Sequence, residues 1–248
     1  MPEEQSITEN IRRVGETLRA ACQRAGRREN EVKLMAVSKT HAAEALAEAF
    51  AAGMRLFGEN RVQEFQQKLP GMQDLGVDVP LNESSNGAHV HLIGHLQSNK
   101  AARAAEIFTS VDTVDSLKLA LRLDEAAGRL RRKLPILLEV KVSDEAAKTG
   151  FAADSAELAE LLERLPNLPH LQMQGLMTVA PLDEDPDAAR NSFRRLRQLR
   201  EQLAGRHPRL DFDELSMGMS GDFEIAIEEG STLIRIGTAI FGSRPKPA

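Results

Sequence analysis

Apolar and β-branched runs recur along most of this chain, and polar or turn-forming segments separate them. Eight of these runs have the length and composition of β-strands. They are KLMAVSK from Lys33, MRLFGEN from Met54, VHLIGH from Val90, FTSVDTV from Phe108, PILLEVKV from Pro135, LQMQGLMTV from Leu171, ELSMGMS from Glu214 and TLIRIGTAIFG from Thr232.

Segments with apolar residues at helical spacing lie between most of these runs. The clearest are HAAEALAEAFAAG from His41, SLKLALRLDEAAG from Ser116, DSAELAELLERL from Asp154 and DAARNSFRRLRQLREQLAG from Asp187. A strand followed by a helix, repeated many times, predicts a parallel sheet with helices packed against it.

The number of repeats favours a closed barrel. Eight units within 248 residues match a (β/α)8 TIM-like barrel, whereas a doubly wound open sheet normally uses fewer strands. We predict an α/β fold with one domain over residues 1–248, the barrel at about 32–242 and an additional N-terminal helix at about 6–25. The segment from Gly71 to Ala88 is polar and broken by Gly and Pro, which predicts an exposed loop of undetermined role.

Charge and composition exclude several classes of protein. A net charge of −5 and a pI near 5.8 argue against a nucleic-acid binder, and the basic run from Arg194 carries leucines at helical spacing, as a packed helix does. No apolar run approaches the roughly 18 residues of a membrane span. One cysteine, Cys22, and no secretory signal favour a cytoplasmic protein. The chain has no tyrosine, so no mechanism can use a tyrosine of its own as acid or base.

Lysine chemistry is the first candidate function. In a barrel of this class the functional site lies at the carboxyl ends of the strands. Lys39 follows the first run and shares a strand face with Met35 and Val37, so an inward-pointing face would place its amine in the barrel mouth. Burial there favours the neutral amine that Schiff-base chemistry needs. A lysine that extends from a strand end into water is the alternative.

Lys141 is the competing lysine. It lies in the apolar run PILLEVKV, and Glu139 precedes it by two residues on the same strand face. This spacing predicts an ion pair inside the protein. An ion pair keeps the amine protonated, and therefore makes Lys141 the poorer nucleophile.

The two last strand runs have features of an anion site. SMGMSGDFEIAIEEG passes from strand to helix near Ser220, which predicts Ser220 as the N-cap. Gly237 and Thr238 offer a backbone that a phosphate can approach and a hydroxyl that can donate to it. Ordinary turns and caps use the same residue types. Arg235 interrupts an apolar run on the face of Gly237, and a buried arginine needs a partner or a ligand.

A metal site is not predicted. His91 and His95 share a strand face, but at roughly 3.3 Å per residue they would lie about 13 Å apart, too far to bind one ion. No phosphate-binding loop or GxGxxG fingerprint occurs, so nucleotide binding by those motifs is not supported.

Six sequence blocks together resemble the pyridoxal phosphate homeostasis protein family. They are AVSKT at 36–40, FGENRVQE at 57–64, HLIGHLQSNK at 91–100, GLMTV at 175–179, LSMGMSGDFEIAIEEGST at 215–232 and RIGTAIFG at 235–242. Each block alone is weak, but the order and spacing of all six are specific, and the resemblance runs from about residue 7 to residue 242.

The resemblance implies a cofactor and the residues that hold it. The family implies a barrel like the N-terminal domain of alanine racemases, with pyridoxal 5'-phosphate (PLP) bound as a lysine Schiff base. By this resemblance Lys39 is the Schiff-base lysine and Arg235 faces the pyridine nitrogen. The residues implied near the phosphate are Ser220, Gly237 and Thr238, and those implied to line the cofactor are Asn60, Met217 and Gly218.

From this resemblance we expect a PLP carrier that is not an enzyme. It would buffer and regulate the cofactor and supply it to apo PLP-dependent enzymes. The alternative is a PLP-dependent amino-acid racemase. Racemases of the similar fold use a lysine on one face of the cofactor and a tyrosine from a second domain on the other, and this chain has no tyrosine. A third possibility, a Schiff-base aldolase without cofactor, predicts a colourless protein.

Overall fold

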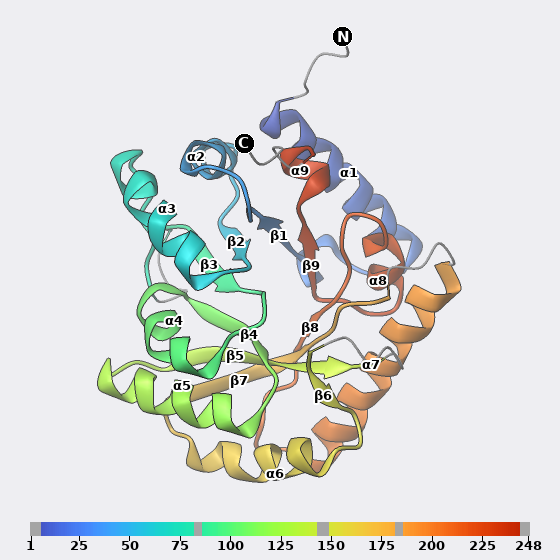
Figure 1. Cartoon of the computed structure of the whole chain (residues 1–248). Helices are drawn as coiled ribbons and strands as arrows, with labels where there is room; N and C mark the ends of the chain where they lie inside the picture. The colour runs from blue at the N-terminus through green and yellow to red at the C-terminus, as the bar shows by residue number, and fades with distance from the viewer. Residues whose placement is uncertain (1–5, 82–85, 143–148, 182–185, 244–248) are drawn as a thin grey trace.

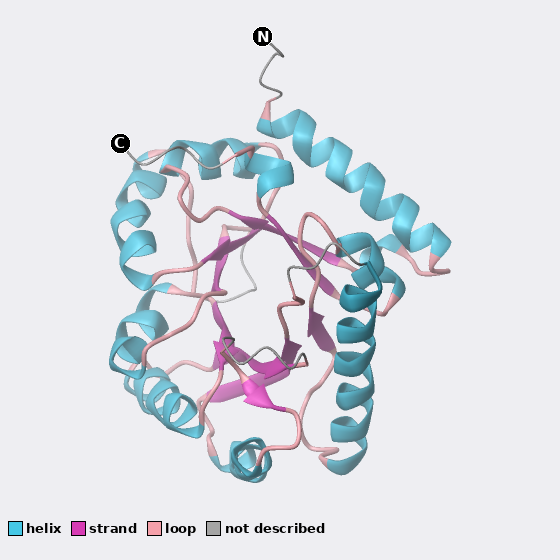
Figure 2. Ribbon diagram, turned by 45° about the vertical axis from the view of Figure 1, so that its right-hand side comes forward, coloured by secondary structure: helices cyan, strands magenta, loops and turns pink. Residues whose placement is uncertain are grey.

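The computed structural model describes residues 6–81, 86–142, 149–181 and 186–243. Within these residues eight parallel strands close into a ring, because the sheet order β4-β3-β2-β1-β9-β8-β7-β5 is completed by pairing of β4 with β5 (Figure 2). The strands are β1 (Lys33–Val37), β2 (Leu56–Glu59), β3 (His89–Leu92), β4 (Ser110–Val114), β5 (Leu134–Lys141), β7 (Leu171–Met177), β8 (Glu214–Ser216) and β9 (Leu233–Ile236). A short strand, β6 (Phe151–Ala152), pairs with the end of β5 outside the ring. The predicted TIM-like barrel is confirmed.

Helices surround this ring on its outer side (Figures 1 and 2). They are α1 (Ile7–Arg24), α2 (Ala43–Ala51), α3 (Val62–Asp74), α4 (Ala101–Ile107), α5 (Leu117–Arg129), α6 (Ala156–Arg164), α7 (Pro186–Arg206), α8 (Phe223–Glu228) and α9 (Thr238–Phe241). The additional helix α1 begins after Ser6, whose side chain accepts a hydrogen bond from the Glu9 amide, and it packs against α8 and α9.

Two separate layers of buried side chains follow from the alternation along each strand. Ala36 and Phe57 point outward and join the continuous apolar core beneath the helices. Met35, Val37 and Leu233 are also buried but do not belong to that core, which places them in the barrel interior. The expected orientation of that strand face therefore agrees with the packing. Strand β1 ends at Val37, and Lys39 follows in the turn after it.

The barrel interior is unusually polar. Buried Arg235, His91, Asp112 and Glu139 come from four different strands, where a barrel of this class is usually filled by branched apolar side chains. Each polar side chain must therefore find a partner inside the ring.

The segment from Gly71 to Ala88 departs from the prediction of an exposed loop. Helix α3 continues through Pro70 and Gly71 to Asp74, and Met72, Val77 and Ala88 are buried in the outer core. Residues 82–85 of this segment lie outside the described residues. Packing of these apolar side chains on the barrel outweighs the turn-forming composition.

The last predicted strand was also too long. Strand β9 ends at Ile236, and residues Thr238–Phe241 form the short helix α9. The apolar residues Ile240 and Phe241 pack beside α1 in this helix rather than extending the sheet. A short run of apolar residues is compatible with either conformation, so the sequence did not distinguish them.

Candidate functional site

Lys39 lies in the turn that follows β1, at the carboxyl end of the barrel, and is half-buried. The next residue, Thr40, has a left-handed backbone with φ of 68°, which is unusual for a β-branched residue and turns the chain sharply after Lys39. The turn therefore keeps Lys39 beside the strand ends.

A buried polar cluster fixes the backbone on both sides of Lys39. Before it, Ser38 Oγ donates to Glu59 Oε1 at 2.7 Å, and Lys68 Nζ donates to the Ser38 carbonyl at 3.1 Å. After it, the Thr40 amide donates to Glu64 Oε1 at 2.5 Å. These contacts tie the end of β1 to β2 and α3.

An ion pair lies at the centre of this cluster. Lys68 Nζ is 2.5 Å from Glu59 Oε1, and the two side chains are 6% and 0% exposed. Burial raises the pKa of Glu59, whereas the Lys68 charge and the hydrogen bonds from Lys68 and Ser38 lower it. Sequence reasoning missed this pair, because its members are on different elements. Only the spacing of Glu64 and Lys68 on one helix face was available as a signal.

Arg235 lies deep in the barrel, on β9 and opposite Met35 of β1 in the strand register. Its guanidinium donates to Ser216 Oγ at 2.7 Å and to the Thr178 carbonyl at 2.8 Å. Burial lowers its pKa, although an arginine stays protonated in proteins. The predicted interior arginine is therefore present, and it presents a fixed positive charge below the barrel mouth.

Three carboxylates favour the charged form of Arg235, which means that they raise its pKa. They are Asp112, Asp222 and Glu139. Burial raises the pKa of Glu139 and of Asp222, while Arg235 lowers both. Asp222 Oδ1 also accepts a hydrogen bond from the Met219 amide at 2.6 Å. The charge of Arg235 therefore partly offsets the rise in pKa that burial causes at Glu139 and Asp222.

The segment after β8 turns sharply at Gly218, which has φ of 99° and whose carbonyl accepts the Arg235 amide at 2.9 Å. A Cβ at Gly218 would lie 2.6 Å from Ala226 Cβ, so only glycine allows this approach of the loop to α8. The Met217 side chain packs in the outer core, which leaves only its backbone near the mouth.

Ser220 does not have the predicted N-cap position. It lies in a turn, and Asp222 is the N-cap of α8, with no capping hydrogen bond from its side chain. Gly221 and Asp222 separate Ser220 from the first helical residue, Phe223. The Asp222 carboxylate accepts a hydrogen bond from the Met219 amide, so a turn over residues 219–222 precedes the helix. Ser220 is half-buried at the carboxyl end of the barrel.

The remaining predicted residues lie at the same end. Gly237 follows β9 and approaches β1 so closely that a Cβ would lie 3.3 Å from the Val37 carbonyl oxygen. Thr238 is exposed, and half-buried Asn60 follows β2. Strands β2, β1, β9 and β8 are consecutive in the ring, so the structure brings all the predicted residues to one mouth.

The ion pair expected between Glu139 and Lys141 is absent from the described residues. Glu139 Oε1 instead accepts a hydrogen bond from Thr149 Oγ1 at 2.8 Å. Glu139 is 7% exposed, whereas Lys141 at the strand end is half-buried. His95 and Arg235, from two other strands or the loops after them, both lower the pKa of Glu139, and neither interaction could be read from spacing within β5.

A histidine–aspartate pair at this end was also not predicted from the sequence. His95 Nδ1, in the loop after β3, is 2.9 Å from Asp115 Oδ2, in the loop after β4. The described residues contain no group of three or more His, Cys, Asp or Glu placed to hold a metal ion. In the same ranges, no helix is long and apolar enough to cross a bilayer.

Comparison with known proteins gives consistent likenesses. The family description "Alanine racemase, N-terminal domain" matches residues 6–245. The pyridoxal phosphate homeostasis protein of Vibrio cholerae is 43% identical over 239 residues, which cover 96% of this chain and 97% of that protein. PipY of Synechococcus elongatus, solved with PLP bound, has a TM-score of 0.78 and 41% identity, covering 91% of this chain and 99% of that one.

An alanine racemase of Clostridium difficile shares the fold at a much lower identity. The TM-score is 0.71 and the identity 14%, over 96% of this chain and 58% of the racemase chain. The likeness to the racemase therefore concerns the barrel alone.

Proposed function

The chain belongs to the pyridoxal phosphate homeostasis protein family, and from that membership we propose that it binds PLP and carries, buffers and regulates the cofactor inside the cell. The relative from Vibrio cholerae, at 43% identity, is a pyridoxal phosphate homeostasis protein, and PipY was solved with PLP bound. The alanine racemase, in contrast, is only 14% identical to this chain. In this proposal residues 1–248 act as a single cytoplasmic binding domain, and apo PLP-dependent enzymes receive the cofactor.

The chemistry of the barrel mouth fits PLP. When bound, PLP supplies an aldehyde that combines with amines and a ring that withdraws electrons. Lys39 provides an amine at the mouth, and Arg235 provides a buried cation below it. The observation that carries the proposal is that Lys39 directly follows β1, Arg235 lies inside the ring on the paired strand β9, and hydrogen bonds at Ser38 and Thr40 fix the backbone on both sides of Lys39.

We assign Lys39 Nζ as the atom that holds the cofactor covalently. Ser38 is anchored to the buried Glu59 and Lys68, so the backbone before Lys39 has little freedom. A fixed backbone lowers the entropy lost when the amine is placed at the aldehyde.

Arg235 faces the pyridine nitrogen in this proposal. Its hydrogen bonds to Ser216 and Thr178 hold the guanidinium in place. A fixed positive charge opposes protonation of a neighbouring ring nitrogen. An unprotonated ring withdraws electrons poorly, and for this reason the site suits storage of the cofactor better than catalysis on amino acids.

The phosphate is assigned to Ser220, Gly237 and Thr238, with Asn60, Met217 and Gly218 lining the cofactor. Thr238 offers an exposed hydroxyl, and the turn at Ser220 offers another beside it on the neighbouring strand end. Met217 contributes through its backbone, since its side chain lies in the outer core.

The test is the absorption spectrum of the purified protein with PLP, followed by borohydride reduction and peptide mapping. We expect a visible band in the wild type and in Lys141→Ala, no band in Lys39→Ala, and the reduced adduct on the peptide containing Lys39. Transfer is then measured as activation of an unrelated apo PLP-dependent enzyme. A band that persists in Lys39→Ala with the adduct on Lys141 contradicts the assignment, and absence of transfer contradicts the carrier role.

A further inference from the structure

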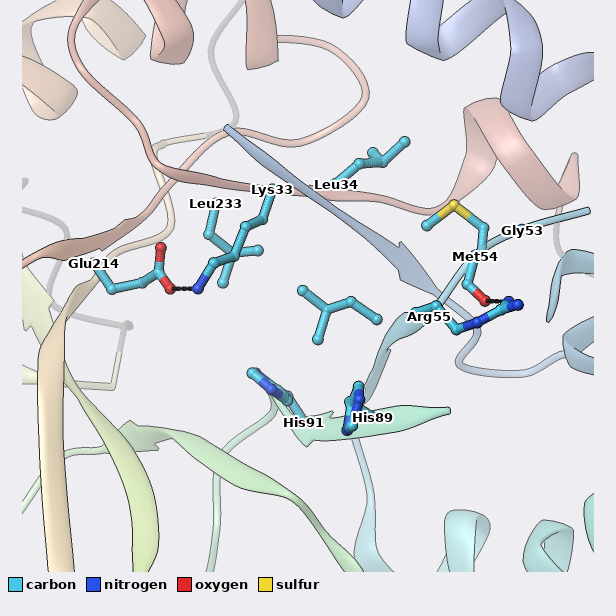
Figure 3. A pocket seen from close by; sticks show the side chains of 10 residues that line it. Lys33, Leu34, Gly53, Met54, Arg55, His89, His91, Glu214 and Leu233 are labelled. Carbon is cyan, nitrogen blue, oxygen red and sulfur yellow. Dashed lines mark hydrogen bonds and ion pairs between the residues drawn. The ribbon is translucent and has the colours of Figure 1, made fainter. Parts of the chain in front are cut away.

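A lysine lies at each end of strand β1, and the two have different surroundings. Lys33, at the start, lies beside a cavity of about 360 Å³ that the first residues of five strands line below His91 (Figure 3). Its ammonium is 2.6 Å from a carboxylate oxygen of Glu214, so its charge is paired. Lys39 lies just beyond the other end, in a turn that is bonded to a carboxylate outside the proposed PLP site.

Lys39 and Thr40 are the two central residues of this turn. The turn runs from Ser38 to His41, and the His41 amide donates to the Ser38 carbonyl at 3.1 Å. Thr40 has φ of 68°, whereas Lys39 is not among the described residues with positive φ. This combination is that of a type II turn, whose third position normally holds glycine or asparagine.

Threonine at the third position strains the turn. In a left-handed backbone the Cβ of an L-residue comes too close to the following carbonyl oxygen, and a β-branched side chain tolerates this conformation poorly. Thr40 is exposed, so burial of its side chain does little to offset the strain. Strain of this kind persists only where the surrounding structure imposes it. The turn therefore needs a contact that favours the left-handed form.

Glu64 of helix α3 supplies such a contact. The Thr40 amide donates to Glu64 Oε1 at 2.5 Å, and Lys68 Nζ, one helical turn further on, is 3.6 Å from the same oxygen. In a type I turn the peptide between Lys39 and Thr40 is reversed, so its carbonyl oxygen would point to the carboxylate in place of its N–H. An ionised carboxylate only accepts hydrogen bonds, so the two oxygens would repel each other. Glu64 therefore favours the strained turn over the unstrained one.

From this geometry we propose that Glu64 is a positioning residue for Lys39. It holds the peptide after Lys39 in one orientation, and thereby keeps the lysine in a single backbone conformation at the barrel mouth. A lysine that is already placed loses less entropy when it binds an aldehyde. The inference rests on the proposed binding of PLP at Lys39, and it adds that the outer helix α3 contributes to the affinity through the turn.

The first test is the affinity of the purified full-length variants for PLP, measured by absorption titration. Glu64→Ala removes the acceptor, whereas Glu64→Gln keeps an amide oxygen in its place. We expect Glu64→Ala to bind PLP about three- to tenfold more weakly, and Glu64→Gln to stay within about twofold of the wild type. Glu48→Ala, an exposed position on α2, is the control and should leave the affinity unchanged.

Rescue at the turn separates positioning from a merely structural role. Glycine adopts the left-handed backbone without strain, so Thr40→Gly in the Glu64→Ala background should restore most of the lost affinity. Thr40→Val is the matched control in that background, because it keeps the branched side chain and therefore the strain. A general weakening of α3, or an effect of the Glu64 charge acting through space, would not be reversed by Thr40→Gly.

A second readout does not use the cofactor. Amide hydrogen exchange at residue 40, followed by NMR in the protein without PLP, reports the hydrogen bond to Glu64 directly. Exchange should be slow in the wild type and in Glu64→Gln, and about tenfold faster in Glu64→Ala. In the double variant Glu64→Ala with Thr40→Gly, exchange should stay fast although the affinity returns, because the turn geometry rather than the bond itself places Lys39.

Two results overturn the inference. One is a Glu64→Ala protein that binds PLP as tightly as the wild type. The other is a loss of affinity that Thr40→Gly does not restore, or that Thr40→Val restores equally well. A wild type that forms no adduct at Lys39 refutes the proposed function instead, and this inference with it. The wild-type titration therefore distinguishes the two failures.

Discussion

The ammonium of Lys68 lies 2.5 Å from the Glu59 carboxylate in the interior of the protein, and both groups contact Ser38, the residue before Lys39. Lys68 belongs to α3, Glu59 to β2 and Ser38 to the end of β1. One buried ion pair therefore joins three elements at the point where the proposed cofactor lysine leaves the barrel.

Breaking this pair on one side should destabilise the fold strongly. Lys68→Met leaves Glu59 buried and uncompensated, which costs about 3–5 kcal/mol of unfolding free energy. The double variant Lys68→Met with Glu59→Gln should recover most of that loss. Denaturant unfolding measures both, with Arg103→Gln as a control, since its pair with Glu106 is exposed and contributes about 0–1 kcal/mol. Equal losses in the two variants would show that the pair does not act as a unit.

The buried Glu139 gives stability a specific dependence on pH. Burial raises its pKa, so the folded protein binds the proton more tightly than the unfolded chain does. Stability is then lost as pH rises above the ordinary glutamate value of about 4.3. Glu139→Gln removes this loss, so the variant should gain stability over the wild type at neutral pH but not at low pH. Unfolding curves across pH test this, and Glu106→Gln at the surface should show no such difference.

Phosphate binding is expected to depend on neutral donors. Thr238→Val removes one hydroxyl, and a hydrogen bond to a charged group contributes about 1.5–3 kcal/mol. The affinity for PLP should fall by about tenfold or more, whereas pyridoxal, which lacks the phosphate, should bind equally to variant and wild type. Thr17→Val on α1 is the control, because its exposed hydroxyl donates to the Arg13 carbonyl of the same helix, far along the chain from the proposed phosphate site. Equal wild-type affinities for PLP and pyridoxal would contradict the phosphate assignment.

The protein with bound PLP should have almost no turnover with amino acids. Arg235 opposes protonation of the ring nitrogen, and the chain has no tyrosine to move a proton on the opposite face. Incubation with L- and D-alanine, followed by measurement of racemisation and keto-acid formation, tests this. Robust racemisation in the wild type that disappears in Lys39→Ala would favour the racemase instead of the carrier.

Gly175 is expected to tolerate no side chain. It lies in β7 where the pairing with β5 shifts register, and a Cβ there would lie 1.9 Å from the Glu214 carbonyl oxygen. Gly175→Ala must displace β8 and should cost more than about 3 kcal/mol of unfolding free energy. Gly205→Ala in α7 meets no atom within 4 Å and should stabilise by up to about 1 kcal/mol. Comparable stabilities for the two variants would refute this account.

The sequence determined the class of fold, because its information is local and repeated. Each apolar run and each helical pattern specifies one element, and short connections allow only a parallel ring. The alternation of Met35 and Val37 predicted the inward face of β1, whereas the choice of Lys39 as the cofactor lysine came from the family resemblance of the AVSKT block. Arg235 was also recognisable, since a charged residue inside an apolar run must meet a partner within the protein.

Tertiary structure decided what depends on contacts between distant segments. The pairing of Lys68 with Glu59 required α3 to pack over β2, and the groups that lower the pKa of the buried Glu139 are Thr149, His95 and Arg235 rather than its neighbour Lys141. Whether Ile240 and Phe241 extended β9 or formed α9 depended on the surface of α1, because the apolar residues themselves suit either conformation. The cavity below His91 exists only because five strand starts meet there, and no local pattern encodes the volume that their side chains leave unfilled.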